Sequence, residues 1–161
     1  MITVYHGSVM EVKEPLATLG RRNLDFGQGF YVTDMRWQAE RWAKRKGART
    51  LKAPVVSVYD FDVDGARAAF RTLKFDAYDK RWLDFIAASR KGHEPWKGYD
   101  MIEGGVANDN VIDTVEDYLN GRMSAEAALG ELARHQPNNQ ICLLRQEVID
   151  RYLFFLESFE M

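Results

Sequence analysis

Strand-like segments lie near both ends of the chain, and segments with helical periodicity occupy its middle. Six short strands are predicted, at residues 2–5, 29–33, 55–61, 99–106, 140–144 and 152–159. The strands and helices do not alternate regularly, as they would in a doubly wound parallel sheet. The order of elements therefore predicts an α+β fold with helices inserted in the middle of the chain.

Apolar residues at helical spacing predict four helical segments. Thr33 or Asp34 can cap the first helix. This helix is expected to run to Lys46, with Gly47 just past its end. Its inward face would hold Met35, Ala39, Trp42 and Ala43. The other helical segments are predicted at residues 66–90, 111–119 and 124–135, and Asp109 is placed to cap the helix that begins at 111.

The bulk composition predicts one domain over residues 1–161, because 161 residues with 46% hydrophobic content can bury a sizeable core. No apolar run approaches the roughly 20 residues that span a bilayer. Residues 1–6 contain neither a basic nor an apolar signal region, so we expect a cytoplasmic protein without membrane contact. The single cysteine, Cys142, permits no internal disulfide and is expected to be a small buried side chain.

The charge of the chain is unevenly distributed. The net charge of −2 argues against a generic nucleic-acid binder, yet residues 21–52 hold nine Lys or Arg and three Asp or Glu. This stretch is either a basic rim that attracts a pyrophosphate or an RNA backbone, or the solvated face of an amphipathic helix. The three histidines, His6, His93 and His135, are scattered without metal-ligand spacing, so no metal site is expected.

Three short segments place a polar side chain at the start or end of a predicted strand: Tyr5–Ser8, Phe26–Tyr31 and Asn138–Ile141. His6 ends its strand and is followed by Gly7, so its ring would lie beside backbone that a ligand can approach closely. Taken singly, each segment is also compatible with a structural histidine, a core aromatic residue or a turn.

Taken together, the three segments resemble the His-Tyr-Glu/Gln triad of the ADP-ribosyltransferase superfamily, with His6, Tyr31 and Gln140 as its members. The segment 26–35 resembles the part of poly(ADP-ribose) polymerases that carries the triad tyrosine. Residues 5–8 are similar to their His-Gly-Ser/Thr motif, and 139–141 to their Asn-Glu-Tyr-Ile region, with glutamine in place of glutamate.

The chain as a whole resembles more closely a bacterial family of ADP-ribosyltransferase-like domains. That family shows the patterns YHGS, DFGxGFYxT, QAxxWA, YDxIxGxVAxD and NNQIC. The corresponding stretches here are 5–8, 25–33, 38–43, 99–109 and 138–142. This resemblance implies two split antiparallel sheets that form a cleft for NAD⁺, which is the substrate, with no metal.

The resemblance also implies roles for individual residues. His6 would bind the adenine-side ribose, the Gly7 backbone would hold the nicotinamide carboxamide, and Tyr31 and Trp42 would stack on the nicotinamide ring. The other residues implied in NAD⁺ binding are Tyr5, Ser8, Phe30 and Asn139. Ala39 replaces a hydroxyl that contacts the carboxamide in the polymerases.

Gln140 offers the ribose a neutral carbonyl oxygen and cannot act as a general base. Asp100, Glu103 or Asp109 could supply the missing carboxylate, or could simply belong to a strand and a helix cap.

The implied function is mono-ADP-ribosyl transfer from NAD⁺ to a protein, nucleic-acid or small-molecule acceptor. The resemblance further implies the toxic or modifying component of a bacterial toxin-antitoxin-type system, with a small antitoxin protein as partner. Two alternatives stay open: an NAD⁺ glycohydrolase, in which water takes the ribose, and a catalytically silent module that binds a nucleotide or a partner protein.

Overall fold

Two β-sheets form the frame of the molecule. The computed structural model describes residues 1–20, 24–135 and 138–161. The first sheet is antiparallel, with the strand order β1 (Ile2–Ser8), β3 (Val55–Phe61) and β7 (Leu153–Glu160). The second sheet has the order β2 (Phe30–Val32), β6 (Gln140–Leu143), β5 (Met101–Gly104) and β4 (Thr72–Lys74). Because β4 runs parallel to β5, the second sheet is mixed, which corrects the expectation of two antiparallel sheets.

The described residues also form six α-helices and one short 3₁₀ helix (Ala17–Leu19). The α-helices are α1 (Arg36–Thr50), α2 (Val63–Ala69), α3 (Lys80–Arg90), α4 (Asp109–Leu119), α5 (Ala125–Leu132) and α6 (Gln146–Tyr152). The expected α+β class is therefore correct. None of these helices is both long and apolar enough to cross a membrane.

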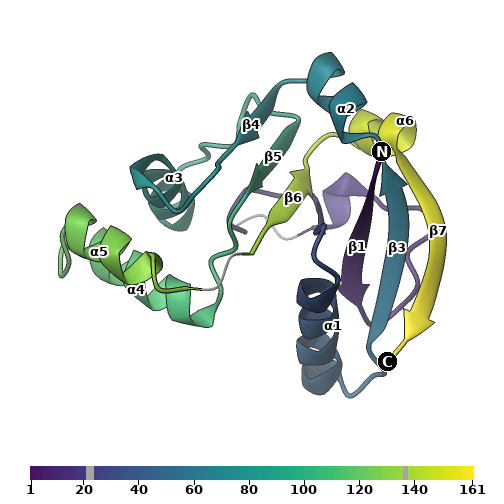
Figure 1. Cartoon of the computed structure of the whole chain (residues 1–161), viewed down its shortest axis with the longest axis horizontal. Coiled ribbons are helices and arrows are strands. Elements are labelled where there is room, and N and C mark those ends of the chain that lie inside the picture. Colours follow the sequence, from purple (N-terminus) through teal and green to yellow (C-terminus); the bar gives the residue numbers. More distant parts are fainter. Residues whose placement is uncertain (21–23, 136–137) are drawn as a thin grey trace.

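The two sheets enclose one core, and the second sheet shares another core with three helices. Buried side chains from both sheets, including Val4, Phe30 and Ile141, meet in the first core. On its other face the second sheet packs against α3, α4 and α5, with Trp82 and Ile102 among the residues buried there. Figure 1 shows this arrangement: the three helices lie on the far side of the second sheet from β1, β3 and β7.

The helix predicted over 66–90 is wrong, because two helices and a strand occupy this stretch. The first helix, α2, begins at Val63, where the side chain of Asp62 accepts a hydrogen bond from the Gly65 N–H. The chain then extends as β4, which pairs with β5. Asp79 starts α3 by accepting a hydrogen bond from the Trp82 N–H at 2.9 Å. Two side-chain caps therefore interrupt the helical pattern. The short helix α6 was not predicted.

The ends of α1 and α4 also differ from their predictions. Met35 precedes α1 without a side-chain cap, and the Thr33 hydroxyl instead accepts a hydrogen bond from the Met35 N–H at 3.0 Å. The helix continues past Gly47 to Thr50. A side chain at 47 would lie 2.7 Å from the Lys52 carbonyl oxygen, so this glycine serves close packing inside the helix. Asn108, not Asp109, caps α4.

All six predicted strands are present, with ends shifted by up to three residues, whereas β4 was not predicted. The two sheets are joined at one isolated bridge, where Tyr5 of β1 pairs with Thr33, the residue after β2. The Tyr5 N–H donates to the Thr33 carbonyl at 2.8 Å, and the Thr33 N–H donates to the Tyr5 carbonyl at 2.9 Å. This bridge sets the position of the candidate site.

Candidate functional site between the two sheets

Beyond the bridge, β1 and β2 no longer pair through their backbones. The Tyr31 carbonyl accepts a hydrogen bond from the His6 imidazole Nδ1, at 2.7 Å, in place of a backbone N–H. Alternate residues of a strand direct their peptide groups to the same edge. Gly7 therefore presents its N–H and C=O on the same edge of β1 as Tyr5, away from β3. Since β1 is an edge strand of its sheet, this edge has no strand partner among the described residues at Gly7, and this unpaired stretch beside Tyr31 is the gap between β1 and β2.

His6 is held as a neutral ring with a defined tautomer. Its imidazole lies against the Phe30 ring, with 4.3 Å between ring centroids. Burial lowers the pKa of His6 from 6.5 to about 4, so the ring is uncharged at neutral pH. A carbonyl can only accept, so Nδ1 carries the proton that binds the Tyr31 oxygen. Nε2 consequently offers a lone pair, and no donor among the described residues occupies it.

The Tyr31 hydroxyl anchors the preceding turn. It donates to the Gly27 carbonyl at 2.6 Å and accepts from the Phe26 N–H at 3.1 Å. Burial raises the pKa of Tyr31 well above its usual value, so the hydroxyl stays protonated. The aromatic ring, rather than the hydroxyl, is therefore the group that Tyr31 can offer to a ligand.

Gln140 begins β6 on the same face of the second sheet as Tyr31. Tyr31 lies opposite Cys142, and residues two apart on a strand share a face. The buried Gln140 side chain places Nε2 3.4 Å from Asp25 Oδ2 and 3.4 Å from the Gly105 carbonyl oxygen. Both neighbours are acceptors, so the amide nitrogen must face them. The Gln140 Oε1 atom has no donor among the described residues and is available to a ligand.

Asp25 is a site residue that the sequence analysis missed. Its side chain is 11% exposed and accepts hydrogen bonds from the Ala107 N–H at 3.1 Å and from Arg90 at 3.2 Å. Burial raises the pKa of Asp25, and the Arg90 charge opposes that rise. The available signal was its place directly before the Phe26-Gly27 turn that Tyr31 anchors.

Two of the three carboxylates considered from the sequence are engaged elsewhere. Glu103 is buried and forms a bidentate ion pair with Arg67, at 2.8 and 2.9 Å. Asp100 accepts from the Arg71 N–H at 2.9 Å and lies 3.7 Å from Arg145. The side chain of Asp109 lies outside what the structure describes.

Asn139 fixes α1 against the start of β6. The Gln38 side chain donates to the Asn139 carbonyl at 2.5 Å and accepts from its N–H at 3.1 Å. The Thr33 hydroxyl donates to the same carbonyl at 2.8 Å, and the Asn139 side chain donates to Asp34 at 3.2 Å. The backbone of Asn139 is thus fully used within the protein, and this residue positions its neighbour Gln140.

The other predicted site residues on β1 and β2 pack against the protein and hold the two strands in place. Phe30 is a core residue on which His6 rests. Tyr5 packs against the small side chains of α1 on the opposite face of β1 from His6. Ser8 is buried at the end of β1, where its hydroxyl lies 3.5 Å from the Lys46 ammonium.

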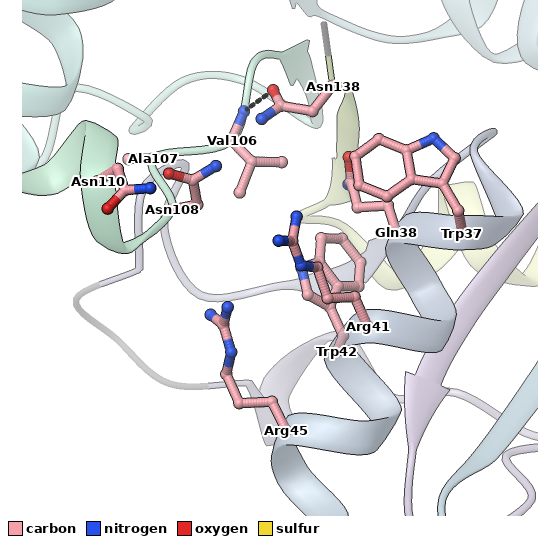
Figure 2. A pocket seen from close by; sticks show the side chains of 10 residues that line it. All are labelled: Trp37, Gln38, Arg41, Trp42, Arg45, Val106, Ala107, Asn108, Asn110 and Asn138. Atoms are coloured by element: carbon pink, nitrogen blue, oxygen red, sulfur yellow. Dashed lines mark hydrogen bonds between the residues drawn. The ribbon is translucent and has the colours of Figure 1, made fainter. Parts of the chain in front are cut away.

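A pocket of about 350 Å³ lies between α1 and the segment that leads into α4 (Figure 2). It is lined by Trp37, Gln38, Arg41, Trp42, Arg45, Val106, Ala107, Asn108, Asn110 and Asn138. Of the predicted site residues, Trp42 is among those that line it. The pocket adjoins the Gln140 site, because the Ala107 N–H binds Asp25 and Asn138 lies two residues before Gln140. The sequence analysis noted the basic stretch but not this pocket.

In the described part of the chain, no three His, Cys, Asp or Glu side chains gather in a way that could hold a metal ion. No curated protein and no solved structure matches the chain. Residues 2–155 match the family described as a protein of unknown function, DUF3990, and the chain therefore belongs to that family.

Proposed function

We propose that this protein is a mono-ADP-ribosyltransferase that uses NAD⁺ as its donor. The observation that carries the proposal is the gap between β1 and β2, where His6 binds the Tyr31 carbonyl. In the proposed complex, a neutral imidazole acceptor, an unpaired peptide edge and an aromatic ring would surround the nicotinamide riboside. These are the three kinds of group that a ribose, a carboxamide and a pyridine ring require.

Each part of the nicotinamide riboside has a matching group at the gap. The free N–H and C=O of Gly7 are complementary to the oxygen and the NH₂ of a carboxamide. The Tyr31 ring and Trp42 would enclose the nicotinamide ring by stacking. The lone pair on His6 Nε2 would accept a hydrogen bond from a ribose hydroxyl.

In the proposed reaction, the bond between ribose C1 and the nicotinamide nitrogen breaks, and its electron pair leaves with neutral nicotinamide. Ribose C1 then bonds to an oxygen or nitrogen of the acceptor, whose proton passes to water. The transition state resembles an oxocarbenium ion, as in glycoside cleavage. Groups that direct negative charge toward this ribose therefore accelerate the reaction.

Gln140 and Asp25 would act together on the ribose. The Asp25 carboxylate binds the Gln140 amide nitrogen, and this polarises the amide so that Oε1 becomes a stronger acceptor. Oε1 would take a hydrogen bond from the ribose 2′-hydroxyl. The pair thus offers the developing cation a negative charge that a lone glutamine lacks.

The proposal is tested by incubating the purified protein with radiolabelled NAD⁺ and cell lysate, beside a His6→Ala control. We expect nicotinamide release and transfer of label to an acceptor, both lost in the control. Nicotinamide release without labelled acceptor would instead establish an NAD⁺ glycohydrolase. If neither product forms, the protein is a binding module and the proposal is wrong.

Asp25→Asn is expected to lower kcat for nicotinamide release roughly tenfold with little change in KM. The reason is that Asp25 acts on the ribose through Gln140 and strengthens an interaction made mainly in the transition state. Steady-state kinetics of nicotinamide release measure this split. Asp100→Asn is the matched control, because Asp100 is also a largely buried acceptor for a backbone N–H but is held near Arg71 and Arg145.

A charge exchange between the two positions sharpens this test. Gln140→Glu alone places a second carboxylate beside Asp25, and we expect it to lower both stability and activity. Combining it with Asp25→Asn restores one negative charge and one amide to the pair. Recovery of stability and kcat in the double variant, beyond the sum of the single effects, is expected. Simple additivity would show that the two side chains do not act together.

A further inference from the structure

We infer that the pocket between α1 and residues 106–110 binds a nucleotide unit of a single-stranded nucleic acid, and that this strand is the acceptor. The binding itself is independent of NAD⁺. The acceptor role rests on the proposed function.

Two tryptophans give the pocket surfaces on which a base can stack. Trp37 is 38% exposed, so part of its indole is open to a ligand in the pocket. The Arg41 guanidinium lies 5.9 Å from the centre of the Trp37 ring, one turn further along α1. An exposed indole with a guanidinium beside it offers a nucleobase a stacking surface and its phosphate a nearby positive charge.

The charge around the pocket suits a phosphate backbone. None of the described residues that line it is acidic, and Arg41 and Arg45 project from α1 toward the segment around Asn108 (Figure 2). Arg49 follows at the same four-residue spacing, so three cations form a stripe along α1, with a rise of about 6 Å from each to the next. The acidic residue in α1, Glu40, is engaged by Arg36 at 2.8 Å. The stripe extends past the pocket. A nucleic-acid strand needs cations for several phosphates, whereas a free nucleotide would need them only at the pocket.

The asparagines opposite α1 supply hydrogen-bond donors for a base edge. The Asn138 Oδ1 atom accepts from the Val106 N–H at 2.9 Å, and the Asn108 Oδ1 atom caps α4 by accepting from the Val111 N–H at 3.1 Å. No acceptor among the described residues binds their amide nitrogens, which can therefore donate to a ligand. Donor nitrogens of this kind match the carbonyl oxygens and ring nitrogens of nucleobases.

The pocket also lies where an acceptor is needed. Trp42, which would stack on the nicotinamide, lines its wall, and Ala107 connects it to Asp25. A protein acceptor with a cationic side chain would be repelled by Arg41 and Arg45. A nucleotide is attracted by these arginines and can stack on Trp37, so the observations favour nucleic acid over a protein acceptor with a cationic side chain.

The test is fluorescence anisotropy with labelled single-stranded DNA and RNA of about 12 nucleotides, without NAD⁺. We expect binding that weakens with salt, and a roughly tenfold rise in Kd for Trp37→Ala and for Arg41→Ala. Arg134→Ala is the control, since it removes the same charge from an exposed position in the turn after α5. The inference would be overturned if neither the DNA nor the RNA oligonucleotide bound, or if all three variants changed Kd equally.

A second readout separates this inference from the proposed function. With labelled NAD⁺ added, the oligonucleotide should acquire label that nuclease releases and protease does not. Cleavage of NAD⁺ with transfer only to protein would leave the proposed function standing and refute the nucleic-acid acceptor. Oligonucleotide binding without any NAD⁺ cleavage would refute the proposed function and the acceptor role. The inference that the pocket binds a nucleic acid would still hold.

Discussion

His6→Ala is expected to reduce kcat/KM for nicotinamide release roughly 100-fold. The change removes the Nε2 acceptor for the ribose and also the Nδ1 bond to the Tyr31 carbonyl. Without that bond, β2 is no longer held to β1 at Tyr31. The Tyr31 ring and the Gly7 peptide edge would then lose their fixed positions together. The rate is measured by release of labelled nicotinamide, with protein folding checked by circular dichroism.

His6→Gln separates these two contributions. Glutamine can place a carbonyl oxygen near the position of Nε2 but cannot bind the Tyr31 carbonyl in the same way. We expect it to recover part of the activity that alanine loses. Activity equal to the wild type in His6→Ala would place the ribose elsewhere and contradict the proposed site.

The lowered pKa of His6 has a consequence for pH dependence. Between pH 6.5 and about 4, the unfolded chain binds a proton at His6 that the folded protein does not. Stability therefore falls as the pH drops through this range, whereas His6 contributes no change above it. His6→Gln should lack this part of the acid sensitivity when denaturation is measured against pH.

Gly7→Ala is expected to destabilise the protein by about 3 kcal/mol, lowering Tm by roughly 10 °C. A methyl group at position 7 would lie 2.0 Å from the Ala39 carbonyl oxygen and 2.9 Å from the Ala43 nitrogen. Both atoms belong to the backbone of α1, so the clash is relieved only if the helix moves away from β1. Thermal denaturation followed by circular dichroism measures the effect.

Gly130→Ala is the matched control for this substitution. Gly130 lies within α5, and nothing stands within 4 Å of a methyl group added there. Alanine is favoured over glycine inside a helix by about 1 kcal/mol, so this variant should be slightly more stable than the wild type. If Gly7→Ala behaved like Gly130→Ala, the close packing of α1 on β1 would be wrong.

Six of the seven strands were within reach of the sequence, because period-two patterns are local signals. His6 and Tyr31 were grouped only through the family resemblance, and the bond between the His6 ring and the Tyr31 carbonyl has no local signal. The break between α2 and α3 was not within reach of the sequence, since β4 exists through its pairing with β5 and its own sequence signal is weak. Asp25 was missed for a related reason. Its partners Arg90, Ala107 and Gln140 are distant in sequence, and only the folded chain brings them to one carboxylate.

The bridge between Tyr5 and Thr33 leaves the protein with an incomplete sheet. A carboxamide has the same N–H and C=O groups as a peptide. At Gly7, the nicotinamide carboxamide of NAD⁺ would therefore continue the hydrogen-bond ladder that ends between β1 and β2 after the bridge. In the proposed complex, the nicotinamide carboxamide would take the place of the next strand residue. An ionised carboxylate has no hydrogen to donate to the Gly7 carbonyl, so the same edge would select dinucleotides with an amide over those with a carboxylate.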